Sequence, residues 1–238
     1  MSSKSVFQFV VEHLYKKYRC VSIDIPGFGK SDFVGRITIK KIPYLIHKVI
    51  RKLKIKKFYL VGTSFGGALS LIYADIYKKE IRKIALISPF INFKQFSKLV
   101  YFALRYVAPY VLKKRILTPV YKIVNIIINY DKDMDKTKLY KDFINEKVKR
   151  KAVNAFRIAF ELSSMDLYSV LRKVRKDILF IYGSRDTLLS IKPLQSVFGV
   201  LNNVHLAIFE DVRHYVFTYN PKELAEKIDL FFSDNNVK

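Results

Sequence analysis

The stretch FYLVGTSFGG, from Phe58 to Gly67, decides the fold. Its first four residues are apolar and predict a buried parallel strand, and the run Ala68–Tyr77 after it predicts a helix. Between the two lies a G-x-S-x-G turn, which lifts the hydroxyl of Ser64 clear of the sheet. Glycine is expected at Gly62 and Gly66 because a side chain there would collide with neighbouring backbone. The context favours a serine nucleophile over an ordinary serine in a glycine-rich turn.

The helix after this turn points its N-terminus at Ser64. Its free N–H groups and its dipole therefore face any negative charge that develops beside the hydroxyl. The backbone N–H of Phe65 is the expected donor to such an oxyanion.

This segment resembles the nucleophile elbow of the α/β-hydrolase superfamily, whose catalytic residues follow in the order serine, acid, histidine. A second segment, DIPGFGKSD at Asp24–Asp32, is similar to the loop after the fourth strand of that fold. The resemblance implies a mostly parallel sheet with helices on both faces and an inserted helical cap. It also implies a serine hydrolase that needs no metal and no cofactor.

Apolar runs and amphipathic runs alternate along much of the chain, which predicts parallel strands joined by right-handed crossovers. The expected strands are Cys20–Ile25, Phe58–Val61, Arg82–Ile87, Asp177–Tyr182 and Val204–Phe209. The expected helices outside the cap are Ser5–Tyr18, Thr38–Lys54, Ala68–Tyr77, Ser190–Val200 and Pro221–Phe232. The only cysteine, Cys20, excludes an internal disulfide and is expected in the core.

Residues 91–176 interrupt the alternation. The block contains no glycine and predicts helices over 93–112, 119–130, 136–163 and 167–174, with a polar turn at 131–136. It resembles the cap of the superfamily, so the expected hydrolase core comprises residues 1–90 and 177–238. Its first half is rich in aromatic side chains, namely Tyr101, Phe102, Tyr106, Tyr110 and Tyr121. Ordinary packing, an apolar acyl pocket and contact with lipid are all open for these rings.

Ser64 needs a base, because a neutral hydroxyl is a poor nucleophile. His214 follows the last predicted strand and is the candidate. The histidine in turn needs an acid, and Asp186 follows the penultimate strand in YGSRD. The order Ser64, Asp186, His214 is the order of the superfamily.

The other titratable candidates are placed less well. His13 and His47 lie in predicted helices and His205 lies inside a strand, while Asp166 and Asp211 are weaker candidates for the acid. The trio predicts acyl transfer on carboxylic esters of small or lipid-like substrates. The alternative is an impaired, hydrolase-like binding module at anionic membrane surfaces.

The resemblance starts at the helix before the fourth strand of the family fold. Three strands of that fold, and the His-Gly segment after the third, would lie upstream of Met1. The His-Gly segment supplies a second oxyanion N–H in the family. Loss of one such donor costs about 100- to 1000-fold in turnover. Cys20–Ile25 would then pair directly with Phe58–Val61, or leave buried groups unpaired at about 1–3 kcal/mol each. The alternatives are a misassigned start codon, a degenerate or split hydrolase, and a smaller active enzyme.

The formal net charge is +24, with 44 basic and 20 acidic residues. One interpretation is a surface for anions, and the other is a composition set by A/T-rich codons. The dispersal of the charge favours the second, and no nucleic-acid fold motif accompanies it, so no nucleic-acid partner is expected.

No signal peptide or apolar run of about 20 residues is visible, so a cytoplasmic protein with at most weak membrane contact is expected. The sequence does not indicate an oligomeric state.

Overall fold

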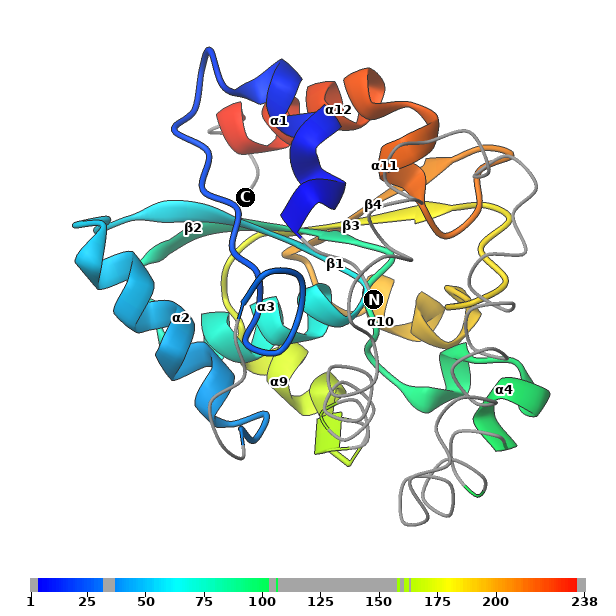
Figure 1. The fold of residues 1–238 in the computed structure, drawn as a ribbon. Helices are drawn as coiled ribbons and strands as arrows, with labels where there is room; N and C mark the ends of the chain where they lie inside the picture. The colour runs from blue at the N-terminus through cyan, green and yellow to red at the C-terminus, as the bar shows by residue number, and fades with distance from the viewer. Residues whose placement is uncertain are drawn as a thin grey trace.

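A central parallel sheet organises the computed structural model, which describes residues 4–31, 37–102, 106, 158, 161–162 and 164–234. Its four strands are β1 (Phe58–Thr63), β2 (Ile81–Ile87), β3 (Ile178–Gly183) and β4 (Val204–Phe209). They lie side by side in chain order and every pair is parallel (Figure 1). The predicted α/β class is confirmed.

Helices cover both faces of the sheet (Figure 1). One layer contains η1 (Lys4–Phe7), α1 (Gln8–Leu14), α11 (Val216–Tyr219) and α12 (Pro221–Ser233). The other contains α2 (Lys41–Lys52), α3 (Phe65–Ile76), α9 (Leu167–Lys173) and α10 (Gln195–Phe198). Short helices η2 (Phe93–Gln95), α4 (Lys98–Phe102) and η5 (Lys192–Leu194) complete the described set. None of the described helices is both long enough and apolar enough to span a bilayer.

Each face of the sheet packs into its own apolar core. Along β2, Ile84 and Leu86 are buried against the layer of α2 and α3, whereas Ala85 and Ile87 are buried against the layer of α1 and α12. This alternation follows from the two-residue period of a strand. All six residues of β3 are buried, since a central parallel strand is covered on both faces.

The predicted first strand, Cys20–Ile25, is wrong. The segment has no strand pairing, so the described sheet has four strands rather than about five. Cys20 is exposed, not in the core, and Val21 is 42% exposed. The segment is instead held at its end, where Asp24 accepts hydrogen bonds from the backbone N–H groups of Lys4 and Lys30 at 2.5 and 3.0 Å.

Two predicted helix starts have side-chain caps. Asn220 accepts a hydrogen bond from the backbone N–H of Glu223 at 3.2 Å and opens α12, with Pro221 at its first position. Asp166 caps α9 in the same way, accepting from Ser169 N–H at 3.1 Å. Asp166 therefore serves as the N-cap of α9.

Most of the predicted cap lies outside the described residues. The helix 119–130 and the turn 131–136 lie wholly outside them, and the helix 136–163 almost wholly. The aromatic residues Tyr110 and Tyr121 also lie outside them. The described helices at the ends of the block are η2 and α4 on one side and α9 on the other, and the boundaries 91 and 176 stay a prediction.

Candidate active site

The turn at Ser64 has the strained backbone that a nucleophile elbow requires. Ser64 has φ 50° and ψ −117° and immediately precedes α3. Its N–H donates to Ile87 O at 2.9 Å, and its carbonyl accepts from Gly67 and Phe90 N–H at 3.0 Å each. A positive φ is costly for a residue with a side chain, so these bonds hold a conformation that the chain would otherwise avoid.

The glycines around Ser64 are needed to different degrees. A Cβ on Gly62 would lie 2.4 Å from Ser70 Oγ and 2.6 Å from Gly66 O, so glycine is required there, as predicted. A Cβ on Gly67 would lie 2.6 Å from Pro89 Cβ. A Cβ on Gly66 would meet nothing within 4 Å, so the predicted collision at Gly66 is wrong.

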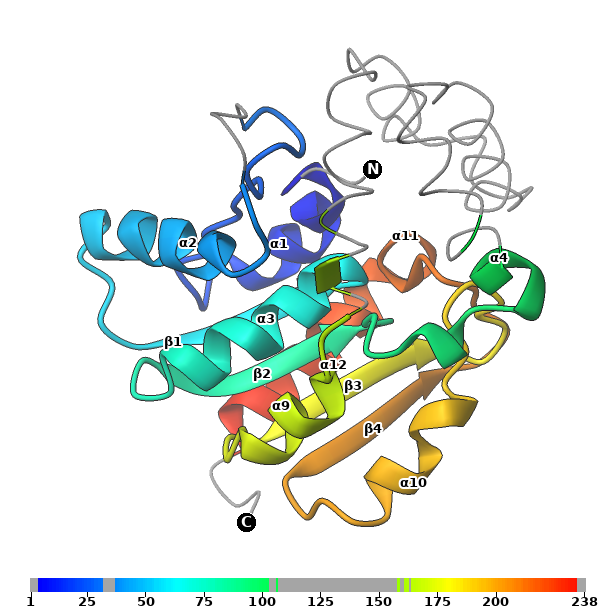
Figure 2. The ribbon, with the colours of Figure 1, turned by 90° about the horizontal axis from the view of Figure 1, so that it is seen from below.

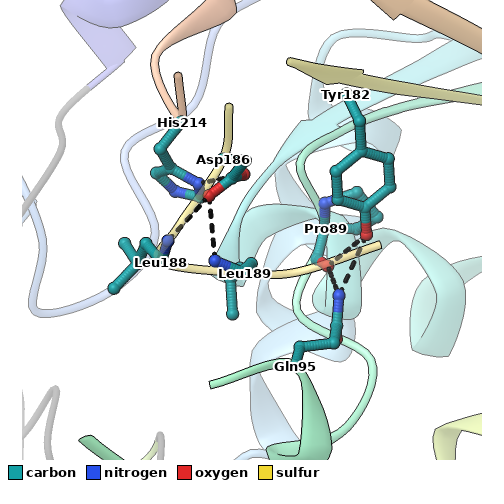
Figure 3. Close-up of polar contacts among 7 residues, drawn as sticks. All are labelled: Pro89, Gln95, Tyr182, Asp186, Leu188, Leu189 and His214. Atoms are coloured by element: carbon teal, nitrogen blue, oxygen red, sulfur yellow. Dashed lines mark hydrogen bonds and ion pairs between the residues drawn. The ribbon is translucent and has the colours of Figure 1, made fainter. Parts of the chain in front are cut away.

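Asp186 and His214 lie in direct contact (Figure 3). His214 Nδ1 is 2.8 Å from Asp186 Oδ2, and the side chains are 10% and 2% exposed. The other carboxylate oxygen, Oδ1, accepts from the backbone N–H groups of Leu188 and Leu189 at 3.0 and 2.9 Å. Both oxygens are therefore fixed, and the carboxylate can hold the imidazole in one orientation.

The pKa of Asp186 lies below its ordinary value. Burial alone would raise this pKa, but the adjacent His214 charge and hydrogen bond, together with the Leu189 N–H, outweigh it. Asp186 is therefore ionised at neutral pH, as the partner of an imidazolium must be.

The loops that carry these residues all leave the carboxyl ends of parallel strands. Ser64 follows β1, Asp186 follows β3 and His214 follows β4. Backbone hydrogen bonds connect the segments at this edge. Ser88 N–H, after β2, donates to Ile181 O of β3 at 2.8 Å, and Arg185 N–H donates to Val212 O in the loop after β4 at 2.9 Å. Ser64 stands on the same edge, half-buried, and its hydroxyl makes no hydrogen bond to another described residue.

The competing residues lie elsewhere. Asp211 is exposed and pairs with Arg185 at 2.7 Å. Among the histidines, His13 is exposed on α1 and His47 Nδ1 lies 3.0 Å from the Tyr73 hydroxyl. His205 lies within β4. Of the described histidines, His214 alone contacts a carboxylate at the carboxyl edge.

The structure also contains a buried hydrogen-bond network that the sequence analysis does not predict. Gln95 donates through Nε2 to Pro89 O at 3.1 Å and to the Tyr182 hydroxyl at 3.0 Å, and the same hydroxyl donates to Pro89 O (Figure 3). Gln95 Oε1 accepts from the N–H groups of Ile91 and Asn92 at 2.6 and 2.9 Å. The network fixes the chain just after β2. The spacing Asn92-x-x-Gln95, a capping box, is the sequence signal that could have shown it.

Aromatic side chains flank the elbow. Phe65 stacks on Phe28 with ring centroids 5.4 Å apart and planes 19° apart. The N–H of Phe90 donates to the Ser64 carbonyl. The ring centroid of Phe90 lies 5.5 Å from that of Phe96 and 5.7 Å from that of Phe93. In contrast, no three His, Cys, Asp or Glu side chains of the described residues gather as metal ligands would.

The chain is similar to known α/β hydrolases in sequence and in fold. A family model described as "alpha/beta hydrolase fold" matches residues 1–114. The chain is 24% identical to the human (Homo sapiens) protein "Monoacylglycerol lipase ABHD6" over 260 residues, covering 99% of this chain and 75% of that protein. It is 25% identical to "Uncharacterized hydrolase YugF" of Bacillus subtilis, covering 97% and 86%.

A solved structure gives the same result for the fold. The crystal structure of MGS-M2, an α/β hydrolase enzyme from a deep-sea metagenome library, superposes with a TM-score of 0.80. The match covers 100% of this chain and 88% of that one at 17% identity.

Proposed function

We propose that this chain, a member of the α/β-hydrolase fold superfamily, is a serine hydrolase that cleaves carboxylic esters of small or lipid-like substrates. The observation that carries the proposal is the buried Asp186–His214 pair, which stands on the same sheet edge as a serine at a strained elbow. A buried, ionised carboxylate on Nδ1 leaves Nε2 of His214 as the base for a hydroxyl.

The proposed reaction runs in two acyl transfers. Ser64 Oγ attacks the ester carbonyl while His214 Nε2 takes its proton, and the imidazolium then protonates the departing alcohol. Water, deprotonated by His214, attacks the acyl-enzyme, and Ser64 regains the proton as the acid leaves. Each turnover consumes one ester and one water and yields one acid and one alcohol.

Phe65 is the proposed oxyanion donor. It is the first residue of α3, so its N–H has no acceptor within the helix. The helix dipole adds to the attraction for a developing alkoxide. A negative charge that forms one residue away therefore meets a donor already in place.

The aromatic residues at the elbow support an apolar acyl group. Phe28, Phe65 and Phe90 belong to segments that contact the serine turn or adjoin it. The named activity of the human relative, a monoacylglycerol lipase, is consistent with such a substrate. We therefore propose medium to long acyl chains over acetyl groups.

The decisive experiment is hydrolysis of p-nitrophenyl esters of increasing acyl length by the wild type and by Ser64→Ala. The variant is expected to lose at least about 1000-fold in kcat, and a fluorophosphonate reagent is expected to label only the wild type. Ser196→Ala, an exposed serine of α10, is the matched control and should keep full activity. His214→Gln is expected to match the loss, whereas His13→Gln is not. Equal rates for wild type and Ser64→Ala would end the proposal.

A further inference from the structure

The edge of the sheet opposite the candidate active site gathers loops that are far apart in the sequence. All four strands start at this edge because they are parallel, and Figure 2 shows it on the left side of the molecule. The loops 53–57, 77–80 and 174–177 precede β1, β2 and β3. Backbone bonds join them directly: Phe58 N–H donates to Glu80 O and Ile84 N–H donates to Asp177 O, each at 3.0 Å.

These loops and the helix ends beside them carry clusters of basic residues. The segment 51–57 reads RKLKIKK, and 172–176 reads RKVRK, with a further pair at Lys78 and Lys79. All their lysines and arginines are exposed except Lys176, which is half-buried. Neighbouring strands lie about 4.8 Å apart, so β1 and β3, which both flank β2, run about 10 Å from each other. Charges that look dispersed along the sequence therefore converge on one surface, here called the amino-edge face (segments 51–57, 76–80 and 172–177).

The acidic residues of this region, namely Asp75, Glu80 and Asp177, are too few to balance that charge. The Glu80 carboxylate is engaged inward, accepting from the Tyr73 hydroxyl at 3.1 Å and lying 3.3 Å from His47 Nδ1. Asp75 pairs with Lys78 at 3.2 Å. By contrast, Lys56, Lys79 and Arg175 form no ion pair with a carboxylate in the described part of the chain.

Apolar side chains stand exposed among these cations. Ile76, the last residue of α3, is 54% exposed, and Val49 on the neighbouring α2 is 41% exposed. Basic residues interspersed with exposed aliphatic residues suit a lipid headgroup layer, where the cations meet phosphates and the aliphatic groups enter the acyl boundary. A nucleic acid would favour the cations but would leave the aliphatic groups without a partner.

We propose that the amino-edge face binds the surface of an anionic phospholipid bilayer, with its lysines and arginines at the phosphates and Ile76 at the acyl boundary. In this orientation the Asp186–His214 edge points away from the bilayer, toward water. The inference stands apart from the ester hydrolase proposal, since no residue of this face touches Ser64, Asp186 or His214.

The first test compares two triple variants of equal charge. Lys56→Glu, Lys79→Glu and Arg175→Glu change one residue in each part of the amino-edge face. Lys94→Glu, Lys98→Glu and Lys192→Glu change three exposed lysines of the opposite edge. Partition onto vesicles of phosphatidylcholine with 30% phosphatidylglycerol is measured by co-sedimentation at 150 mM salt. The first triple is expected to bind at least about a hundredfold more weakly than the wild type.

The control triple is expected to bind within about threefold of the wild type, because screening limits the reach of a charge to about 8 Å at this salt. Equal losses for both triples would overturn the proposal in favour of diffuse attraction. Binding of a 30-nucleotide DNA that the first triple alone loses, with vesicle binding unchanged, would assign the face to nucleic acid instead. Absence of vesicle binding by the wild type would overturn the proposal outright.

The second test uses a fluorescent reporter, because the chain contains no tryptophan. Ile76→Trp places one indole on the amino-edge face, and Phe102→Trp places one on α4, which follows the carboxyl end of β2 and where Phe102 is 57% exposed. Anionic vesicles are expected to shift the emission of the first to the blue and to leave the second unchanged. A shift of the second alone would show that another face binds.

Discussion

At the scale of single residues, the acid is the best-determined member of the candidate site. Three groups bind the Asp186 carboxylate, namely the N–H groups of Leu188 and Leu189 and Nδ1 of His214, and the side chain is 2% exposed. Burial of a lone carboxylate would be expensive, so its stability depends on the donors around it. The pKa of Asp186 is lowered for the same reason. Orientation of the histidine and stability of the fold are therefore linked through one group.

Asp186→Asn is expected to lower kcat by about 10³- to 10⁴-fold, because an amide no longer holds the same imidazole tautomer. It should also change the pH dependence of unfolding. The folded-state pKa is lowered, so the carboxylate stabilises the fold above its unfolded pKa of about 4 and loses that effect as pH falls through the folded value. The stability difference between wild type and variant should therefore shrink below pH about 4, as measured by urea denaturation at several pH values.

Asp211→Asn is the control for this prediction. Asp211 is exposed and only pairs with Arg185 at the surface, so its change should leave both kcat and the pH profile of unfolding nearly unaltered. A larger loss of activity in Asp211→Asn than in Asp186→Asn would reverse the assignment of the acid.

At the scale of elements, the first turn of α3 offers a matched pair of glycines. Gly67→Ala is expected to destabilise the fold by about 1–3 kcal/mol, because its new Cβ would overlap Pro89 in the next loop. Gly66→Ala is expected to be neutral or to stabilise by up to about 1 kcal/mol, because its Cβ enters open space and alanine favours the helix. Chemical denaturation of both variants checks the prediction, and equal effects would contradict it.

The elements show which parts of the structure the sequence could predict. The elbow and the strand-end positions of Asp186 and His214 carry local signals, and so do the helix starts at Asn220 and Pro221, so these were predicted well. The segment Cys20–Ile25 looks like a strand because it is apolar. Apolarity indicates a tendency to be buried, but pairing also requires a neighbour with a free edge, and no local pattern reports this. The Asn92–Gln95 capping box is a local signal, but no local pattern reports the bond from Gln95 to Tyr182, which lies 87 residues away in the sequence.

At the scale of the whole molecule, self-repulsion of the net charge of +24 should matter for stability. The melting temperature is expected to rise by a few degrees between 20 and 500 mM sodium chloride, because salt screens this repulsion. Differential scanning fluorimetry at constant pH checks the rise. The triple variant of the amino-edge face should show a smaller rise, since it carries fewer positive charges. A melting temperature that does not depend on salt would contradict this view of the charge.

The placement of residues 91–176 between two neighbouring strands has a consequence for how the sheet assembles. Phe58 pairs with Ile81 after a short connection, whereas Ile84 pairs with Ile178 across about ninety residues. Closing the longer connection costs about 1 kcal/mol more in chain entropy, and contacts so distant in sequence slow folding. During synthesis, β1 and β2 leave the ribosome long before β3 is made, so the edge of β2 that pairs with β3 stays exposed in the meantime. A chaperone would therefore be most useful after β2 has been synthesised and before β3 has paired with it.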